Sequence, residues 1–311
     1  MLLFKSFCDT IEKSIFSKEV FMKNVKGSLF LLVAAFIWGT AFVAQSLGLN
    51  SVGSFTFNAV RNYVGAITLL PVIFIIDKFK KKDKPSLKTK DNTLLIGGIS
   101  CGAVLALASS LQQMGLEAGA GPGKAGFITA LYIIFVPIAG LFTKKKPRAT
   151  IWIAVILATV GMYLLCVKEG FYLEKADIYL FSCAIAFTLH ILVVDKFSPL
   201  VDCVKLSCIQ FFVCGTICLV CMFLYEEPTI ANIKLAAIPI LYTGIMSSGV
   251  AYTFQIIGQK YTHPSLATLI MSLESVFAAL AGWVVLSEAM SIPELIGSGL
   301  VFAGILVAQL L

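Results

Sequence analysis

The residue with the clearest potential for chemistry is Glu274, an acid inside an otherwise apolar run from Ser265 to Leu286. A helix of about 20 apolar residues crosses a hydrocarbon core of about 30 Å, and a rise of about 1.5 Å per residue places this carboxylate roughly 14 Å deep. A charge at that depth costs at least about 2.5–3.5 kcal/mol on insertion scales. Glu274 therefore requires a partner, a water-filled cavity or a proton. It is a candidate for proton coupling or for binding a cationic group, and the alternative is a permanently paired structural acid.

Arg61, in the second apolar run, is the expected partner of Glu274. Asn58, Arg61 and Asn62 follow a spacing of three and four residues, so they share one helical face. The depths of Arg61 and Glu274 differ by about 6 Å, which two long side chains can bridge if their helices are neighbours. Two other roles remain open for the guanidinium group: reaching outward to lipid headgroups, or binding a substrate carboxylate through two hydrogen bonds.

Other polar and aromatic side chains within apolar runs are candidates for the same site. For the glutamines, hydrogen bonding between helices is an equally good explanation. For the mid-span tryptophan, core packing explains the residue as well as a binding role does. For the histidine, a packing role is favoured over proton relay. The predicted substrate- or proton-binding residues are Glu274, Arg61, Asn58, Trp38, Gln113, Gln255, Tyr132, Tyr252 and His190.

The elements that must position these residues are transmembrane helices. Hydrophobic residues make up 59% of the 311 residues and charged residues 13%, and the mean hydropathy is +0.93, values that soluble domains do not reach. We expect an all-α integral membrane protein, because ten apolar runs of about 20 residues can be counted. These runs lie near 27–48, 54–76, 93–113, 124–142, 149–167, 177–194, 204–224, 235–257, 265–286 and 292–311.

The distribution of positive charge predicts the orientation of these spans. With the N-terminus inside and ten alternating spans, 19 of the 24 Lys and Arg residues fall on the cytoplasmic side and four fall outside. This asymmetry is typical of cytoplasmic loops. We therefore expect an integral protein of the cytoplasmic (plasma) membrane, with ten spans and both termini cytoplasmic.

The chain contains an internal repeat. At an offset of 142 residues, Gln113 coincides with Gln255 and Pro122 with Pro264, together with several apolar positions between Gly102 and Gly140. Each repeat holds five spans, an odd number, so the second copy enters the membrane the opposite way round. This predicts a 5+5 inverted-topology repeat, an architecture of secondary transporters whose sites lie near the midplane. Tyr132, the repeat mate of Glu274, is a candidate hydrogen-bonding gate.

The predicted organisation is a cytoplasmic N-terminal segment at 1–26, a first repeat at 27–167 and a second repeat at 177–311. Residues 1–26 hold five lysines and lack the features of a signal peptide. They could form a short amphipathic interfacial helix. Met22 looks like a natural start before the first span, so residues 1–21 are expected to be dispensable or to come from a misplaced start codon.

Several segments resemble one known family. The run AAFIWGTAFVAQSLGL of the first span, Arg61, the run AGFITALYIIFVP and the ninth-span run SLESVFAALAGWVVLSE are similar to the EamA family of the drug/metabolite transporter superfamily. The resemblance covers about residues 27–311 as two tandem units. It implies transport of small metabolites, such as amino acids, related compounds or drug-like molecules, without a cofactor. The implied partners are a small-molecule substrate, membrane lipid and protons, while the oligomeric state stays open.

Competing classes of function find less support in the residues. Against an intramembrane enzyme, the chain has only two histidines and no HExxH motif, and no acid pair or Ser–His pair is evident at matching depth. The glycine-rich segment at 118–126 fails the pattern of a phosphate-binding loop, and we interpret it as a tight turn. The nine cysteines lie mostly inside apolar runs, where they are expected as small buried hydrophobic residues, so no metal site or disulfide framework is predicted. A membrane scaffold would not need a midplane acid and arginine, and the net charge of +7 gives no reason to expect nucleic acid.

Overall fold

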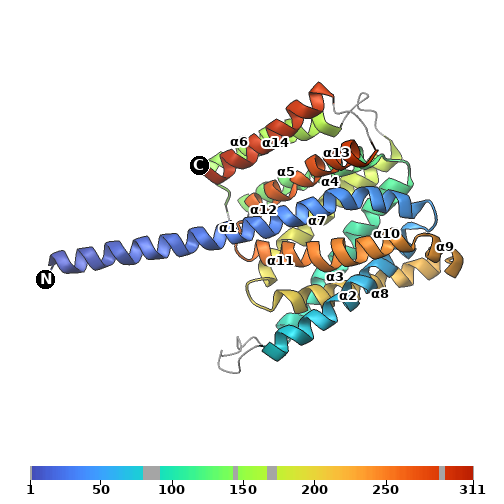
Figure 1. Ribbon diagram of the computed structural model, residues 1–311, viewed down its shortest axis with the longest axis horizontal. Helices are drawn as coiled ribbons and strands as arrows, with labels where there is room; N and C mark the ends of the chain where they lie inside the picture. The colour runs from blue at the N-terminus through green and yellow to red at the C-terminus, as the bar shows by residue number, and fades with distance from the viewer. Residues whose placement is uncertain (1, 80–91, 143–145, 167–173, 287–290, 311) are drawn as a thin grey trace.

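The computed structural model describes residues 2–79, 92–142, 146–166, 174–286 and 291–310, and within these ranges the chain forms helices and no strand (Figure 1). The predicted all-α fold is confirmed. The helices of the first half are α1 (Leu2–Leu49), α2 (Ser54–Phe79), α3 (Thr93–Glu117), α4 (Pro122–Thr129), α5 (Tyr132–Leu141) and α6 (Ala149–Cys166).

The second half begins with α7 (Lys175–Phe197) and α8 (Cys203–Tyr225). It continues through the short helices α9 and α10, the π-helix η1 and three further helices, and it ends with α14. Their bounds are α9 (Ile230–Leu235), α10 (Ala237–Tyr242), η1 (Thr243–Tyr252), α11 (Thr253–Gln259), α12 (Pro264–Met271), α13 (Leu273–Leu286) and α14 (Ile292–Leu310).

Helix length and composition agree with the predicted membrane spans. Among the described residues, nine helical segments are long and apolar enough to cross a membrane, and Ala149–Leu164 within α6 is a shorter apolar helix. Each of the ten predicted apolar runs corresponds to one of these segments. Many apolar side chains remain exposed on the outside of the bundle, for example Phe74 and Ile156, as expected where lipid is the solvent.

Two spans are interrupted at equivalent positions of the two repeats. The helical path breaks at 130–131, between α4 and α5, and at Ser272, between α12 and α13. Ala130 and Ser272 are 142 residues apart, the repeat offset found in the sequence. A third irregularity is the ten-residue π-helix η1, which lies between α10 and α11 in a single membrane-spanning segment. Discontinuous helices of this kind form the substrate sites of many transporters with inverted repeats.

The helices divide into a central bundle and a peripheral pair. In the bundle, α3 packs against α7 and α8, α2 against α8 and η1, and α1 against α13 and α11. The pair α6 and α14 lies at the upper edge of Figure 1. Its two backbones approach so closely that a Cβ on Gly161 would lie 2.6 Å from the carbonyl oxygen of Gly297.

The N-terminal part of α1 projects well beyond the bundle (Figure 1). The sequence suggested a separate interfacial helix within 1–26. The structure instead shows one continuous helix from Leu2 to Leu49, because no Pro or Gly interrupts the chain before Gly27. Whether residues 1–21 are dispensable stays a prediction.

The two ends of the bundle are held in different ways. The loop 50–53 and residues 226–229 mark one end, called the Glu226 end, and residues 259–264 mark the other, called the His263 end. The Glu226 carboxylate accepts hydrogen bonds at 2.7 and 2.8 Å from the backbone N–H groups of Phe55 and Thr56, in the first turn of α2. These N–H groups have no partner within the helix, so Glu226 ties α8 to the start of α2.

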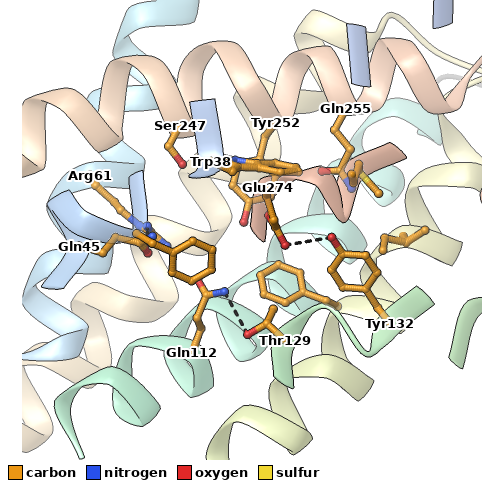
Figure 2. A pocket seen from close by; sticks show the side chains of 14 residues that line it. Trp38, Gln45, Arg61, Gln112, Thr129, Tyr132, Ser247, Tyr252, Gln255 and Glu274 are labelled. Carbon is orange, nitrogen blue, oxygen red and sulfur yellow. Dashed lines mark hydrogen bonds between the residues drawn. The ribbon is translucent and has the colours of Figure 1, made fainter. Parts of the chain in front are cut away.

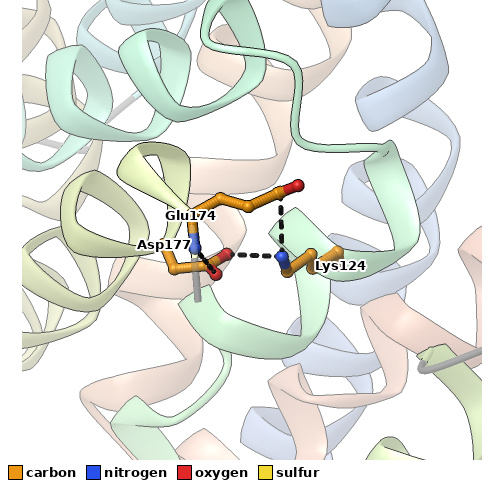
Figure 3. A network of polar contacts seen from close by, with 3 residues as sticks. All are labelled: Lys124, Glu174 and Asp177. Atoms are coloured by element: carbon orange, nitrogen blue, oxygen red, sulfur yellow. Dashed lines mark hydrogen bonds and ion pairs between the residues drawn. The ribbon is translucent and has the colours of Figure 1, made fainter. Parts of the chain in front are cut away.

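Figure 3 shows a second charged contact, which joins the starts of α4 and α7. The Nζ atom of Lys124 lies 2.9 Å from Asp177 Oδ1 and 3.1 Å from Glu174 Oε2. Asp177 is buried and also accepts a hydrogen bond from the Glu174 backbone N–H, as part of a capping box at the start of α7. Both α4 and α7 begin at the Glu226 end, because Glu117 at the end of α3 accepts a hydrogen bond from Ser54 in the first turn of α2, and Lys124 joins the start of α4 to that of α7.

Candidate functional site

A cavity lies in the middle of the bundle, next to both interrupted spans. Protein atoms leave about 470 Å³ of space unfilled there, a volume that includes the opening of the cavity. Side chains from α1, α2, α3, α4, α5, α7, η1, α11, α12 and α13 line it, so nearly every central helix contributes. Figure 2 shows Arg61 and Gln45 on one side of this cavity and Glu274 and Tyr132 on the other.

Glu274 and Tyr132 hydrogen-bond to each other across the two repeats. The Tyr132 hydroxyl donates to Glu274 Oε1 at 3.0 Å, and both residues are nearly fully buried. Each lies in the first turn after the break of its span, so the two breaks bring these repeat mates together. Helix α1 reaches the same point because Gly39 has no side chain. A Cβ there would lie 2.7 Å from the Glu274 backbone oxygen.

Arg61 lines the same cavity but pairs with a neutral residue. Its Nη1 atom donates to Gln45 Oε1 at 2.7 Å, and the guanidinium lies 5.7 Å from the ring centre of Phe57. Arg61 is 3% exposed and Glu274 is 5% exposed. The sequence suggested that these two residues are partners. The structure differs, because Glu274 accepts a hydrogen bond from Tyr132 and Arg61 donates one to Gln45, in place of the contact with each other.

The remaining cavity wall is aromatic and amide-rich. The rings of Trp38 and Tyr252 meet edge to face, with centroids 4.8 Å apart, and Gln112 Nε2 donates to Thr129 Oγ1 at 3.5 Å. Trp38 Nε1, Arg61 Nε and Gln255 Oε1 are buried and have no hydrogen-bond partner among the described protein atoms. Polar atoms buried in this way are normally satisfied by a ligand or by ordered water. The cavity wall is therefore suited to a polar ligand.

Six of the nine predicted site residues line this cavity, and three do not. Arg61, Glu274, Trp38, Tyr132, Tyr252 and Gln255 are brought together. Asn58 and Gln113 are buried beside the cavity lining, with both side-chain amide atoms unpartnered. His190 is fully buried behind the wall, where its Nε2 atom lies 3.2 Å from Gln210 Oε1.

Other cavity residues were missed by the sequence analysis. Gln112 is the neighbour of the predicted Gln113, and one residue on a helix corresponds to a rotation of about 100°. Gln45 is a polar residue inside the first apolar run, and that feature could have identified it as a candidate. The full set of missed lining residues is Phe42, Gln45, Gln112, Thr129, Phe187, Ile191, Ser247 and Met271.

Two further cavities lie nearer the ends of the bundle. At the Glu226 end, a space of about 570 Å³ is lined by Leu49, Thr56 and the acids Glu117, Glu226 and Glu227, among others. At the His263 end, a space of about 840 Å³ is lined by residues that include Lys146, Asp195, Lys260 and the segment 259–264. Among the described residues no group of three or more His, Cys, Asp or Glu side chains is arranged to hold a metal ion.

Comparisons with known proteins agree with this architecture. The EamA-like transporter family matches residues 25–167 and again 174–309. A protein of Archaeoglobus fulgidus described as an uncharacterized transporter is 28% identical over 296 residues, which cover 93% of this chain and 87% of that protein. The uncharacterized transporter YoaV of Bacillus subtilis is 22% identical, covering 90% of this chain and 96% of its own.

The fold also has a counterpart among solved structures. One protein crystal structure superposes with a TM-score of 0.73 at 17% identity, covering 91% of this chain and 96% of that chain. At this identity the likeness concerns the fold alone. The two tandem family matches agree with the two repeats seen in the sequence.

Proposed function

Because this chain belongs to the EamA-like transporter family, it is a membrane transporter, and we propose that it carries a small zwitterionic metabolite, such as an amino acid or a related compound, by alternating access. The observation that supports this substrate class is the pair of opposite charges in one cavity. Arg61 and Glu274 both line it, and each is held by a neutral partner rather than by the other.

This arrangement complements a molecule with a charge of each sign. The guanidinium of Arg61 suits a carboxylate, because its remaining N–H groups can donate to both oxygens. Glu274 suits an ammonium group, and the rings of Trp38 and Tyr252 beside it add a cation–π surface. Binding such a substrate satisfies both charges together, so neither has to be exposed to lipid or bulk water.

Glu274 also provides a means of coupling. As a carboxylate it attracts the ammonium group of the substrate, and after taking up a proton it no longer does so. Transport of a proton in exchange for substrate then follows from competition for one side chain. In this proposal the drive is proton antiport or exchange, and the pseudo-symmetric repeats supply the two facing states.

The orientation proposed from the charge distribution places the His263 end in the cytoplasm. Ten spans then have both termini inside, in the cytoplasmic membrane. The Glu226 end, with its acidic cavity, faces outward, and the cavity with Lys146 and Lys260 faces the cytoplasm. Terminal fusions to a fluorescent protein that is active only in the cytoplasm test this orientation, and loss of fluorescence at either end would contradict it.

The experiment for the function is counterflow in proteoliposomes with radiolabelled amino acids, preceded by a thermal-shift screen of amino acids, nucleosides, sugars and lipophilic cations. A ligand of the folded state raises Tm by mass action. We expect a zwitterion to give both a shift and counterflow. Glu274→Gln is expected to abolish both, whereas neutralising the exposed acid in Glu227→Gln leaves them intact. Full activity in Glu274→Gln would exclude the proposed coupling role.

A further inference from the structure

We propose that the cavity at the His263 end is the cytoplasmic vestibule of the substrate path, and that Gln259 is the residue that closes it off from the central site. This inference rests on the proposed transport function. It assigns a passage, a gating residue and a substrate class, small polar solutes that carry a carboxylate, to a part of the molecule outside the central cavity.

The two cavities are separated by one helical turn. Gln255 lines the central cavity and Gln259 lines the vestibule, and both belong to α11. Residues four apart on a helix lie on the same face, with their Cβ atoms about 5–6 Å apart. The two amides therefore form a continuous polar strip from one cavity to the other.

A weak hydrogen bond connects Gln259 to a residue of the central cavity wall. Ile191 of α7 lines the central cavity, and its backbone oxygen accepts a hydrogen bond from Gln259 Nε2 at 3.4 Å. That length is at the weak limit for such a bond. In this proposal, the two cavities join when the Gln259 amide moves away from Ile191, a change that breaks no helix.

The vestibule also has unsatisfied polar groups that suit a polar solute. Gln259 is 2% exposed and Thr262 is 5% exposed, and Gln259 Oε1 and Thr262 Oγ1 have no hydrogen-bond partner among the described atoms. The charged side chains around this space are Lys146 and Lys260, together with Asp195 and His263. The lysines favour the approach of a carboxylate from the cytoplasm.

The opposite end is closed by stronger contacts. Glu226 binds the first turn of α2 at 2.6–2.8 Å, and Lys124 forms ion pairs with Asp177 and Glu174. Phe57, fully buried, fills the space between Gly48 and Arg61. In this conformation the cytoplasmic side is thus the one that opens with the least rearrangement.

The test measures access to the central cavity, not transport. Ser247→Cys introduces a thiol into the cavity wall, and a charged, membrane-impermeant thiol reagent is applied to inside-out or right-side-out vesicles. Peptide-level mass spectrometry follows this cysteine alone, so the native cysteines stay in place. In the Gln259→Ala background we expect labelling from the cytoplasmic face to rise at least fivefold, with labelling from outside unchanged.

Two further variants make the result specific. Gln259→Leu keeps the volume of the side chain, but leucine cannot donate a hydrogen bond to Ile191. If that hydrogen bond holds the gate, labelling from the cytoplasmic face rises in both Gln259 variants. Gln113→Ala is the matched control, a buried glutamine that lines none of the three cavities, and it is expected to leave labelling unchanged. No increase in either Gln259 variant, or an equal increase from both faces, would overturn the proposed gate. Because labelling needs no substrate, failure of counterflow with successful labelling refutes the function and not the passage.

Discussion

Tyr132 and Glu274 occupy equivalent positions in the two repeats, yet one supplies a hydroxyl group and the other a carboxylate. Their hydrogen bond at 3.0 Å lies where the two halves meet. A symmetric pair of acids would repel each other there, and a symmetric pair of tyrosines would keep their protons near neutral pH and supply no negative charge for a cation. In the proposed function, the difference between these repeat mates is what allows this contact to bind and release substrate.

We expect Tyr132→Phe to destabilise the protein by about 1–3 kcal/mol, because it leaves a buried carboxyl group without its hydroxyl donor. The loss in the double variant Tyr132→Phe/Glu274→Gln should be smaller than the sum of the two single losses. Thermal unfolding of detergent-purified protein measures all three values. The exposed Tyr163→Phe is the control, and strict additivity in the cycle would show that the two side chains are not coupled.

For single residues, the sequence identified the charged side chains of the cavity but not the residues to which they hydrogen-bond. Glu274 and Arg61 could be singled out because intramembrane charges are rare and need compensation. Their actual partners, Tyr132 and Gln45, depend on helix rotation and on the breaks in two spans. A rotation of one residue separates Gln112, which lines the cavity, from Gln113, which does not.

The interrupted spans α4–α5 and α12–α13 are the elements that shape the cavity. Their breaks at 130–131 and at Ser272 fall at equivalent positions, although the local sequences differ. Hydropathy predicts both as single apolar runs, because no charge and no proline marks the break itself. The repeat offset was visible in the sequence, whereas the break and the π-helix η1 arise from packing and have no comparable sequence signal.

The peripheral pair α6 and α14 depends on close backbone approach, which gives a prediction with an internal control. In Gly161→Ala the new Cβ would meet the Gly297 carbonyl oxygen at 2.6 Å, so we expect a loss of about 1–3 kcal/mol from overpacking. In Gly299→Ala nothing lies within 4 Å of the new Cβ, and its higher helix propensity should leave stability unchanged or improve it by up to about 1 kcal/mol.

Thermal unfolding of the two alanine variants beside the wild type measures this difference. Equal Tm values for Gly161→Ala and Gly299→Ala would contradict the close packing of α6 on α14.

For the whole molecule, the charge pattern and the internal repeat predicted the fold better than any single residue could. Apolar runs, positive loops and a shared offset each constrain the chain over long distances, so errors of a few residues at helix ends do not change the result. The fold and the family were within reach for this reason. The contacts at the Glu226 end could not be predicted, because they join residues far apart in sequence, such as Thr56 and Glu226.

The ion pairs of Lys124 are expected to help hold the Glu226 end closed. Lys124→Met removes the contacts to Asp177 and Glu174. We expect labelling of Ser247→Cys from the outer face to rise about two- to fivefold, the effect of about 0.5–1 kcal/mol for a contact at the edge of the protein. Lys175→Met, an exposed lysine one helical position away from Glu174, is the control. Identical labelling in both variants would exclude this role.

The close contact between α6 and α14 has a consequence for synthesis of the protein. Helix α6 ends at Cys166 and α14 begins at Ile292, so roughly 130 residues must be translated after α6 before its partner exists, which takes about 6–26 s at about 5–20 residues per second. During that interval the glycine-bearing surface of α6 lies uncovered in the membrane. Helix α14 thus completes a contact whose other half, α6, was made much earlier, and a ribosome stalled before α14 should leave a nascent chain bound to the insertion machinery.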